Sequence, residues 1–141
     1  MNRENDAIRS DVYPSLYYDD APAAIDFIER AFGFRRRLVV PGENGGVRHS
    51  ELTYGNVVVM VGTADAKAGK ISPKGSKGAS SGLSIRVEDP DAHHARSVAA
   101  GADVVRPLED APYGSRGYMV KDPEGHYWYF ATYKPGAHWT E

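Results

Sequence analysis

Two polar side chains that could carry out acid–base chemistry are separated by a single residue. His49 and Glu51 lie in a stretch typical of a β-strand, Val47 to Tyr54, where residues two apart point to the same face. A histidine beside a carboxylate can act as a general base near neutral pH. A metal site is the less favoured reading, because no third histidine or carboxylate stands at a supporting spacing. We expect a polar pair that contacts a ligand or a neighbouring strand, with general-base chemistry as the alternative.

Aromatic residues are concentrated near the C-terminus. In a strand, alternation sends Trp128 and Phe130 to one face and Tyr127 and Tyr129 to the other. The first pair is typical of a core. The second face would carry Tyr129 into an open cavity, where its ring could stack on a flat or aromatic ligand.

Other residues that could take part in chemistry have simpler interpretations. Arg86 shares a strand face with Gly82, where it would pair with an anionic ligand group or else remain an exposed rim arginine. His93 and His94 are adjacent on a predicted helix, so they cannot bind one metal together, and we expect both at the surface. The sequence contains no Ser-His-Asp arrangement, P-loop or dinucleotide fingerprint.

These residues must be positioned by elements that occur twice along the chain. A strand (Val12 to Tyr18) is followed by Asp19 or Asp20 as helix cap and by a helix, Ala21 to Phe32, that ends at Gly33. A second strand beginning near Leu83 is followed by a helix from Pro90 to Ala100, with Ala92, Ala95, Val98 and Ala99 along its expected buried face.

Three strands are predicted after each helix. They cover Phe34 to Val40, Val47 to Tyr54 and Val57 to Thr63 in the first half, and Asp103 to Pro107, Ser115 to Lys121 and His126 to Tyr133 in the second. The sequence therefore predicts an α+β fold of paired βαβββ modules that form an eight-stranded curved sheet, with both helices on the convex side. We expect one domain over residues 1–141, comprising a first module (12–63), a linker (64–81), a second module (82–133) and a tail (134–141).

Composition excludes several classes of protein. The net charge of -2 gives no electrostatic reason to expect a nucleic-acid partner, and no apolar run is long enough to cross a membrane. The absence of cysteine removes thiolate chemistry and fits a cytoplasmic protein. The 64–81 segment is rich in lysine and glycine, which favours a solvated linker, with a lid over a binding site as the alternative.

Three motifs, in this order, give the chain a family resemblance. They are the helix sequence from Asp19 to Phe34, Glu51-Leu-Thr-Tyr-Gly-Asn56, and Tyr113-Gly-Ser-Arg-Gly-Tyr118 followed by Asp122-Pro-Glu-Gly-His-Tyr-Trp128. Over nearly its full length the chain resembles the vicinal oxygen chelate superfamily, which includes glyoxalases, bleomycin resistance proteins and extradiol dioxygenases. The resemblance implies small-molecule binding and homodimers in which two chains complete each other's cavity.

The resemblance also implies where a divalent metal would be held. The four ligand positions of the catalytic branches fall on Tyr13, Met60, Gly82 and Tyr129. Glycine offers no side-chain ligand, a thioether is soft, and neutral tyrosines are poor ligands for hard metals. We therefore expect no metal and no cofactor.

The combined expectation is a protein that binds and sequesters a small aromatic molecule or antibiotic. Its binding residues are predicted to be Tyr13, Tyr17, His49, Glu51, Met60, Arg86 and Tyr129. The alternative is an isomerase, epimerase, lyase or dioxygenase of the same superfamily that uses His49, Glu51 or a tyrosine as acid or base, or an atypical metal site.

Overall fold

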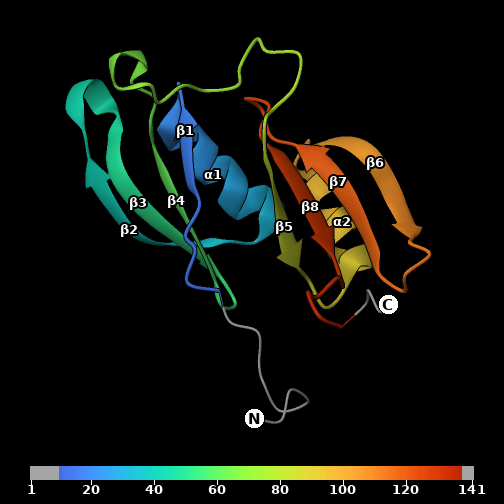
Figure 1. Cartoon of the computed structure of the whole chain (residues 1–141). Coiled ribbons are helices and arrows are strands. Elements are labelled where there is room, and N and C mark those ends of the chain that lie inside the picture. The colour runs from blue at the N-terminus through green and yellow to red at the C-terminus, as the bar shows by residue number, and fades with distance from the viewer. Residues whose placement is uncertain (1–9, 138–141) are drawn as a thin grey trace.

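The computed structural model describes residues 10–137 and contains two βαβββ modules, which Figure 1 shows side by side. The first module comprises β1 (Ser15–Tyr18), α1 (Ala21–Phe32), β2 (Arg35–Pro41), β3 (Val47–Tyr54) and β4 (Val57–Thr63). The second comprises β5 (Gly82–Arg86), α2 (Pro90–Ala99), β6 (Asp103–Asp110), β7 (Arg116–Lys121) and β8 (Tyr127–Ala131). Short 3-10 turns, η2 (Glu43–Gly45) and η3 (Ala66–Ala68), lie between strands. The predicted α+β class and the paired modules are confirmed.

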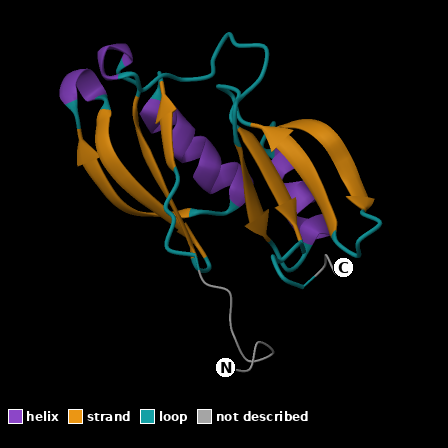
Figure 2. Cartoon of the chain, in the orientation of Figure 1, coloured by secondary structure: helices purple, strands orange, loops and turns teal. Residues whose placement is uncertain are grey.

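The eight strands are divided between two four-stranded sheets. Their strand orders are β1-β4-β3-β2 and β5-β8-β7-β6, and in each sheet the first and last strands of the module run parallel. Figure 2 shows one helix behind each sheet. β1 and β5 are both outer strands, and no ladder joins them within residues 10–137. The curved surface of one chain therefore consists of two separate sheets, one per module.

The first helix has the bounds that the sequence predicts. The side chain of Asp20 accepts a hydrogen bond from the backbone N–H of Ala23 at 3.1 Å, and a proline occupies the first turn. Gly33 ends α1 with φ of 79°, a left-handed conformation that favours glycine. The helix buries seven side chains: Ala21, Ala24, Ile25, Phe27, Ile28, Ala31 and Phe32.

The prediction for the second helix is wrong in the face that it buries. α2 ends at Ala99, and its buried residues are Pro90, His93 and Ser97, whereas Val98 is 48% exposed. His93, expected at the surface, is 7% exposed. The reason is that α2 packs against polar partners: the Ser97 hydroxyl donates to the carbonyl oxygen of Ala31, and His93 contacts that of Phe32.

One hydrophobic core extends across both modules. The ring of Phe32, at the end of α1, lies 5.0 Å from Trp128 and 4.7 Å from Phe130 between centroids, both on β8. Trp128 and Phe130 are fully buried, as expected for the core face of that strand. Aromatic packing of this kind adds about 0.5–1.5 kcal/mol per pair beyond the buried area. The first helix is thus an integral part of the second module's core.

Both ends of α1 are also held by the second module. At the start of the helix, the carboxylate of Glu124 accepts hydrogen bonds from the backbone N–H groups of Asp19 (2.7 Å) and Asp20 (2.9 Å). At its end, the guanidinium of Arg96 donates to the carbonyl oxygens of Arg30 (3.0 Å) and Glu29 (3.1 Å). An anion at the N-terminus and a cation at the C-terminus both complement the helix dipole. The relative position of the two modules is therefore fixed by charge as well as by packing.

Several element boundaries differ from the prediction by one to three residues, most of all at the start of β1 and the end of β6. β1 begins at Ser15, so Tyr13 precedes the strand and is 53% exposed. The 64–81 segment contains η3 and an isolated bridge between Asp65 and Lys70. The end of the predicted tail, residues 138–141, lies outside the described residues. None of the helices in the described part of the chain is long and apolar enough to span a membrane.

Candidate functional site

The polar candidates of the first module lie on the side of its sheet that faces away from α1. Leu52 and Val59 are paired across β3 and β4, and both are fully buried under the helix. Side chains alternate along a strand, so His49, Glu51 and Met60 project from the opposite face. All three are half-buried. As expected from the sequence, the alternation of side chains along each strand places these three residues together on the concave face of the sheet.

His49 and Glu51 are in contact. The imidazole Nε2 of His49 lies 3.2 Å from Oε2 of Glu51, while Nε of Arg37 donates to Oε1 of the same carboxylate at 2.9 Å. The hydrogen bond from Arg37, followed by that from His49, lowers the pKa of Glu51. Glu51 is therefore ionised at neutral pH. It orients the imidazole of His49, which is the member of the pair that could exchange a proton.

Tyr17 is the other half-buried candidate on this face. It lies on β1, and the ammonium group of Lys70 is 5.5 Å from the centroid of its ring. Lys70 belongs to the segment that connects the modules, so part of that segment crosses the edge of the concave face. A lysine over an aromatic ring is a favourable cation–π contact.

Tyr129 lies in a cavity that belongs to the second module alone. Its volume is about 250 Å³, and it is lined by Gly82, Leu83, Ser84, Arg106, Tyr113, Met119, Tyr127 and Tyr129. The guanidinium carbon of Arg106 is 5.8 Å from the centroid of the Tyr129 ring. Burial, and next the neighbouring hydroxyl of Tyr113, raise the pKa of Tyr129. The phenol is therefore neutral at physiological pH.

Arg106, Met119 and Tyr113 line this cavity, but they were not singled out from the sequence. Arg106 and Met119 are paired across β6 and β7, and the register of β6 shifts on both sides of Arg106. Because a register shift changes the face to which the following residues point, counting alternate residues along β6 does not predict the position of Arg106. Tyr113 stands in the loop before β7, within the Tyr113–Tyr118 motif that carried the family resemblance. That motif was the available signal for it.

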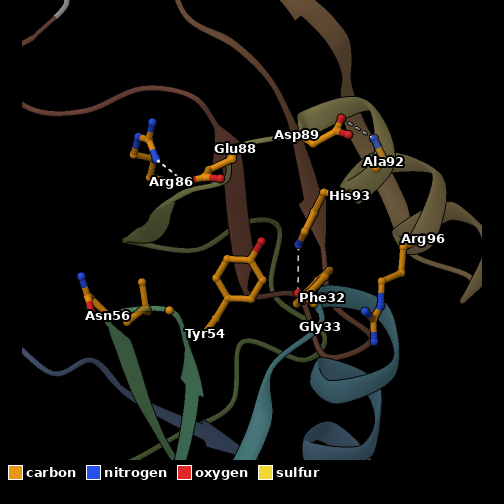
Figure 3. Close-up of a pocket in the computed structure, with 12 residues that line it drawn as sticks. Phe32, Gly33, Tyr54, Asn56, Arg86, Glu88, Asp89, Ala92, His93 and Arg96 are labelled. Atoms are coloured by element: carbon orange, nitrogen blue, oxygen red, sulfur yellow. Dashed lines mark hydrogen bonds and ion pairs between the residues drawn. The ribbon is translucent and has the colours of Figure 1, made fainter.

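Arg86 lies elsewhere, in a cleft between the two modules. The cleft has a volume of about 880 Å³, and Figure 3 shows residues of both modules around it. Its lining comprises Phe32, Gly33, Tyr54, Gly55, Asn56, Val57, Arg86, Glu88, Asp89, Ala92, His93 and Arg96. Nη1 of Arg86 is 3.9 Å from Oε1 of Glu88, and half of the Arg86 side chain is exposed.

The histidine in the wall of this cleft is fully bonded. The Phe32 carbonyl oxygen can only accept, so Nε2 of His93 donates to it at 2.9 Å, and Nδ1 accepts from the hydroxyl of Tyr118 at 2.5 Å. Burial, reinforced by the charge of Arg96, lowers the pKa of His93 in spite of the bond to Phe32. A neutral, doubly bonded imidazole has a structural role and no free nitrogen for catalysis.

The seven predicted site residues thus fall in three places in one chain. Tyr17, His49, Glu51 and Met60 share the concave face of the first sheet, and Tyr13 precedes its edge strand. Tyr129 lies in the second module's cavity, and Arg86 lies in the cleft between modules. Among residues 10–137, no group of three or more His, Cys, Asp or Glu side chains is arranged to hold a metal ion.

Comparison with known families assigns the fold to a known group. The model of the Glyoxalase/Bleomycin resistance protein/Dioxygenase superfamily matches residues 12–130. The chain belongs to this superfamily. Among the four positions that the sequence predicts for metal ligands, Gly82 has no side chain and Met60 presents a thioether.

Relatives within the superfamily include proteins of known structure. TioX from Micromonospora sp. ML1 is 38% identical, with a TM-score of 0.68 over 87% of this chain and 98% of that one. The fosfomycin resistance protein FosX from Mesorhizobium loti shares the fold alone, at 15% identity and a TM-score of 0.66 over 92% of this chain and 95% of that one. An uncharacterised protein of Mycobacterium tuberculosis strain H37Rv is 37% identical over 118 residues, which cover 82% of this chain and 69% of that protein.

Proposed function

We propose that this member of the superfamily binds and sequesters a small aromatic molecule, such as an antibiotic, in the Tyr129 cavity and without a metal. The observation that supports this most strongly is the lining of that cavity, where three tyrosines and a methionine surround about 250 Å³. Rings of tyrosine stack on flat ligands, and methionine adapts its shape to them. The site is small, so the ligand has one or two fused rings.

The superfamily's metal positions support binding over metal-dependent catalysis. Tyr129 and Tyr13 would each have to lose a phenolic proton to become good ligands, and burial opposes that loss at Tyr129. Met60 and Gly82 supply nothing that a hard divalent cation prefers. The four residues suit contacts with an organic ring better than coordination of an ion.

We further propose that the protein acts as a homodimer in which the first module of one chain covers the Tyr129 cavity of the other. In one chain, the face that carries Tyr17, His49 and Met60 and the face that carries Tyr129 belong to separate sheets. A second copy brings a first-module face over a second-module face and completes an enclosed site. The superfamily's dimers commonly share cavities in this way.

An acid–base enzyme is the second candidate function. It rests on the 3.2 Å contact between His49 and Glu51 and on the ionised state of that carboxylate. A His49→Gln variant separates the two functions. If the protein sequesters its ligand, this variant alters affinity at most, whereas an enzyme that uses His49 as its base loses turnover by about 100-fold or more.

The binding proposal is tested with three bicyclic probes of different charge: neutral 2-naphthol, cationic 2-(aminomethyl)naphthalene and anionic naphthalene-2-carboxylate. A thermal-shift screen detects binding, because a ligand at 100 times its Kd stabilises the fold by about 2.7 kcal/mol. Calorimetry then gives Kd for the wild type and for Tyr129→Ala. We expect at least one probe to bind, and its Kd to rise several-fold to more than tenfold in the variant, since a stacked ring contributes about 0.5–1.5 kcal/mol.

Tyr54→Ala is the matched control, because it removes a half-buried tyrosine ring from the separate cleft between the modules. Its affinity for the probe should equal that of the wild type. The proposal is wrong if no probe binds, or if binding depends on Tyr54 and is insensitive to Tyr129.

A further inference from the structure

The Tyr129 cavity has one charged group in its lining. Seven of its eight lining residues are uncharged at neutral pH, and the eighth is Arg106. The guanidinium of Arg106 lies beside the Tyr129 ring, so it is close to where a stacked ligand would be. The cavity therefore combines an aromatic surface with a single positive charge.

Arg106 is only weakly neutralised by its own neighbours. Its ion partner in the described part of the chain is Glu109, at 3.4 Å, and both side chains are more than half exposed. An exposed pair of this kind contributes about 0–1 kcal/mol and is easily exchanged for another partner. The register of β6 shifts on either side of Arg106 and sets this residue opposite Met119, which lines the same cavity.

Other charged residues nearby do not line the cavity. Lys121 lies 6.0 Å from the ring of Tyr127, but it is not among the residues that line the cavity. Asp110, further along β6, pairs with Arg116 at 3.3 Å. Arg106 is therefore the cation in the cavity lining that can meet a ligand.

From this arrangement we propose that the ligand is an aromatic anion, a planar ring that carries a carboxylate or similar group, and that Arg106 determines this specificity. The inference rests on the proposed binding function of the Tyr129 cavity. The ring stacks on Tyr129, and the carboxylate accepts two parallel hydrogen bonds from the guanidinium, a geometry that lysine does not offer. When the ligand binds, Arg106 exchanges its ion pair with Glu109 for one with the anionic group of the ligand.

The test compares two probes with the same ring, naphthalene-2-carboxylate and naphthalene-2-carboxamide, which differ in charge but hardly in shape. Calorimetry on the full-length wild-type protein should show the carboxylate binding about tenfold more tightly than the amide, because hydrogen bonds to charged groups are stronger than neutral ones. The preference should shrink when the salt concentration is raised from 50 to 500 mM, since screening weakens partly exposed charges.

Two variants at Arg106 and one matched control identify the residue responsible. Arg106→Gln should bind both probes equally, at the affinity of the wild type for the amide, and Arg106→Lys should keep a reduced preference. Arg86→Gln removes an arginine of similar exposure from the separate cleft, so it should retain the full preference. Far-UV circular dichroism verifies that all three variants are folded.

Each outcome bears on one proposal or the other. If both probes bind with equal affinity and Tyr129→Ala weakens both, the cavity is the site but the anion specificity is wrong. If the preference survives in Arg106→Gln, another group recognises the charge and the assignment of Arg106 is overturned. If neither probe binds, the aromatic-anion inference fails, and the response to 2-naphthol and 2-(aminomethyl)naphthalene then decides whether the binding function fails with it.

Discussion

Glu124, in the turn before β8, accepts a hydrogen bond from the backbone N–H of Asp20, the residue that caps α1, although 104 residues separate the two in the sequence. The same carboxylate is 7% exposed and also accepts from the hydroxyl of Ser72, at 2.6 Å, in the connecting segment. One side chain of the second module therefore joins the first helix and the segment between the modules.

Replacement of Glu124 by Gln should lower the free energy of unfolding by about 1–2 kcal/mol. The amide of Gln removes the negative charge from the start of α1 and accepts through one oxygen where the carboxylate uses two. Urea denaturation monitored by tryptophan fluorescence measures the difference. Glu88→Gln is the control, because that side chain is 91% exposed, and its effect should stay within about 0.5 kcal/mol.

The stabilisation by Glu124 should disappear in acid. Burial alone raises the pKa of this carboxyl group, but hydrogen bonds from Ser72 and from the backbone of Asp20 and Asp19 outweigh it, so that the pKa is lowered in the folded state. The contribution is therefore complete above the unfolded-state pKa of about 4.3 and is lost as the pH falls through the folded value. The difference in stability between wild type and Glu124→Gln should be constant well above about pH 4.3 and should shrink as the pH falls below it, and a difference that stays constant in acid would contradict this.

A second pH dependence should come from His93. Its pKa is lowered mainly by burial, so the unfolded chain takes up a proton before the folded protein does. Stability should fall as the pH drops below about 6.5, by at most about 1.4 kcal/mol per pH unit. In His93→Gln, which keeps one donor for Phe32 and one acceptor for Tyr118, the loss between pH 7.5 and 5.5 should be smaller than in the wild type.

His94→Gln is the matched control for that experiment. His94 is adjacent on α2 but half-buried, so this variant should retain the wild-type dependence on pH. A slope that is reduced equally by both substitutions would show that burial of His93 is not the cause.

Gly117, on β7, should tolerate no side chain. A Cβ atom there would lie 2.3 Å from the Cβ of Ala131 and 2.5 Å from the carbonyl oxygen of Phe130. Gly117→Ala should therefore destabilise the protein by about 2–3 kcal/mol, at the upper end of the range for overpacking. Gly78→Ala is the control, because nothing lies within 4 Å of its Cβ position, and thermal melting should show no loss of stability for that variant.

The proposed dimer predicts complementation between two defective variants. Tyr17→Ala damages the first-module face and Tyr129→Ala the second-module cavity, so each homodimer should bind naphthalene-2-carboxylate weakly. In a mixed dimer, one of the two sites carries both substitutions and the other site carries neither. Unfolding and refolding an equimolar mixture should therefore restore about one quarter of the wild-type sites, since half of the dimers are mixed and each has one intact site of two. The absence of any recovery, together with a monomeric mass in sedimentation, would refute the shared site.

Local signals in the sequence were sufficient for much of the fold. Asp20, a proline in the first turn and Gly33 define α1 through chemistry within a few residues of each boundary, and its predicted bounds are confirmed. For β8 the local pattern predicts the two faces of the strand, because alternation separates buried Trp128 from half-buried Tyr129. Sequence patterns of this kind predict the elements that are determined by residues close to them in the chain.

Contacts between distant segments account for what the sequence did not predict. The burial of His93 depends on the carbonyl oxygen of Phe32 and the hydroxyl of Tyr118, 61 and 25 residues away, and no hydrophobic pattern encodes such polar partners. The place of Arg106 depends on irregular pairing between β6 and β7. Arg86 and Tyr129 were both placed on the correct strands, but Arg86 lines the cleft between the modules and Tyr129 lines the cavity of the second module. Their separation depends on how the modules pack.

The attachment of α1 to Glu124 has a consequence for synthesis on the ribosome. At about 5–20 residues per second, Asp20 is synthesised about 5–20 s before Glu124, because the two are 104 positions apart. During that interval α1 has neither the carboxylate at its start nor the guanidinium of Arg96 at its end, and the ring of Phe32 has no Trp128 to pack against. A nascent chain that ends before β8 therefore leaves the end of α1 that carries Phe32 uncovered, and chaperones that bind exposed aromatic side chains should associate with the first half of the protein until the second half is complete.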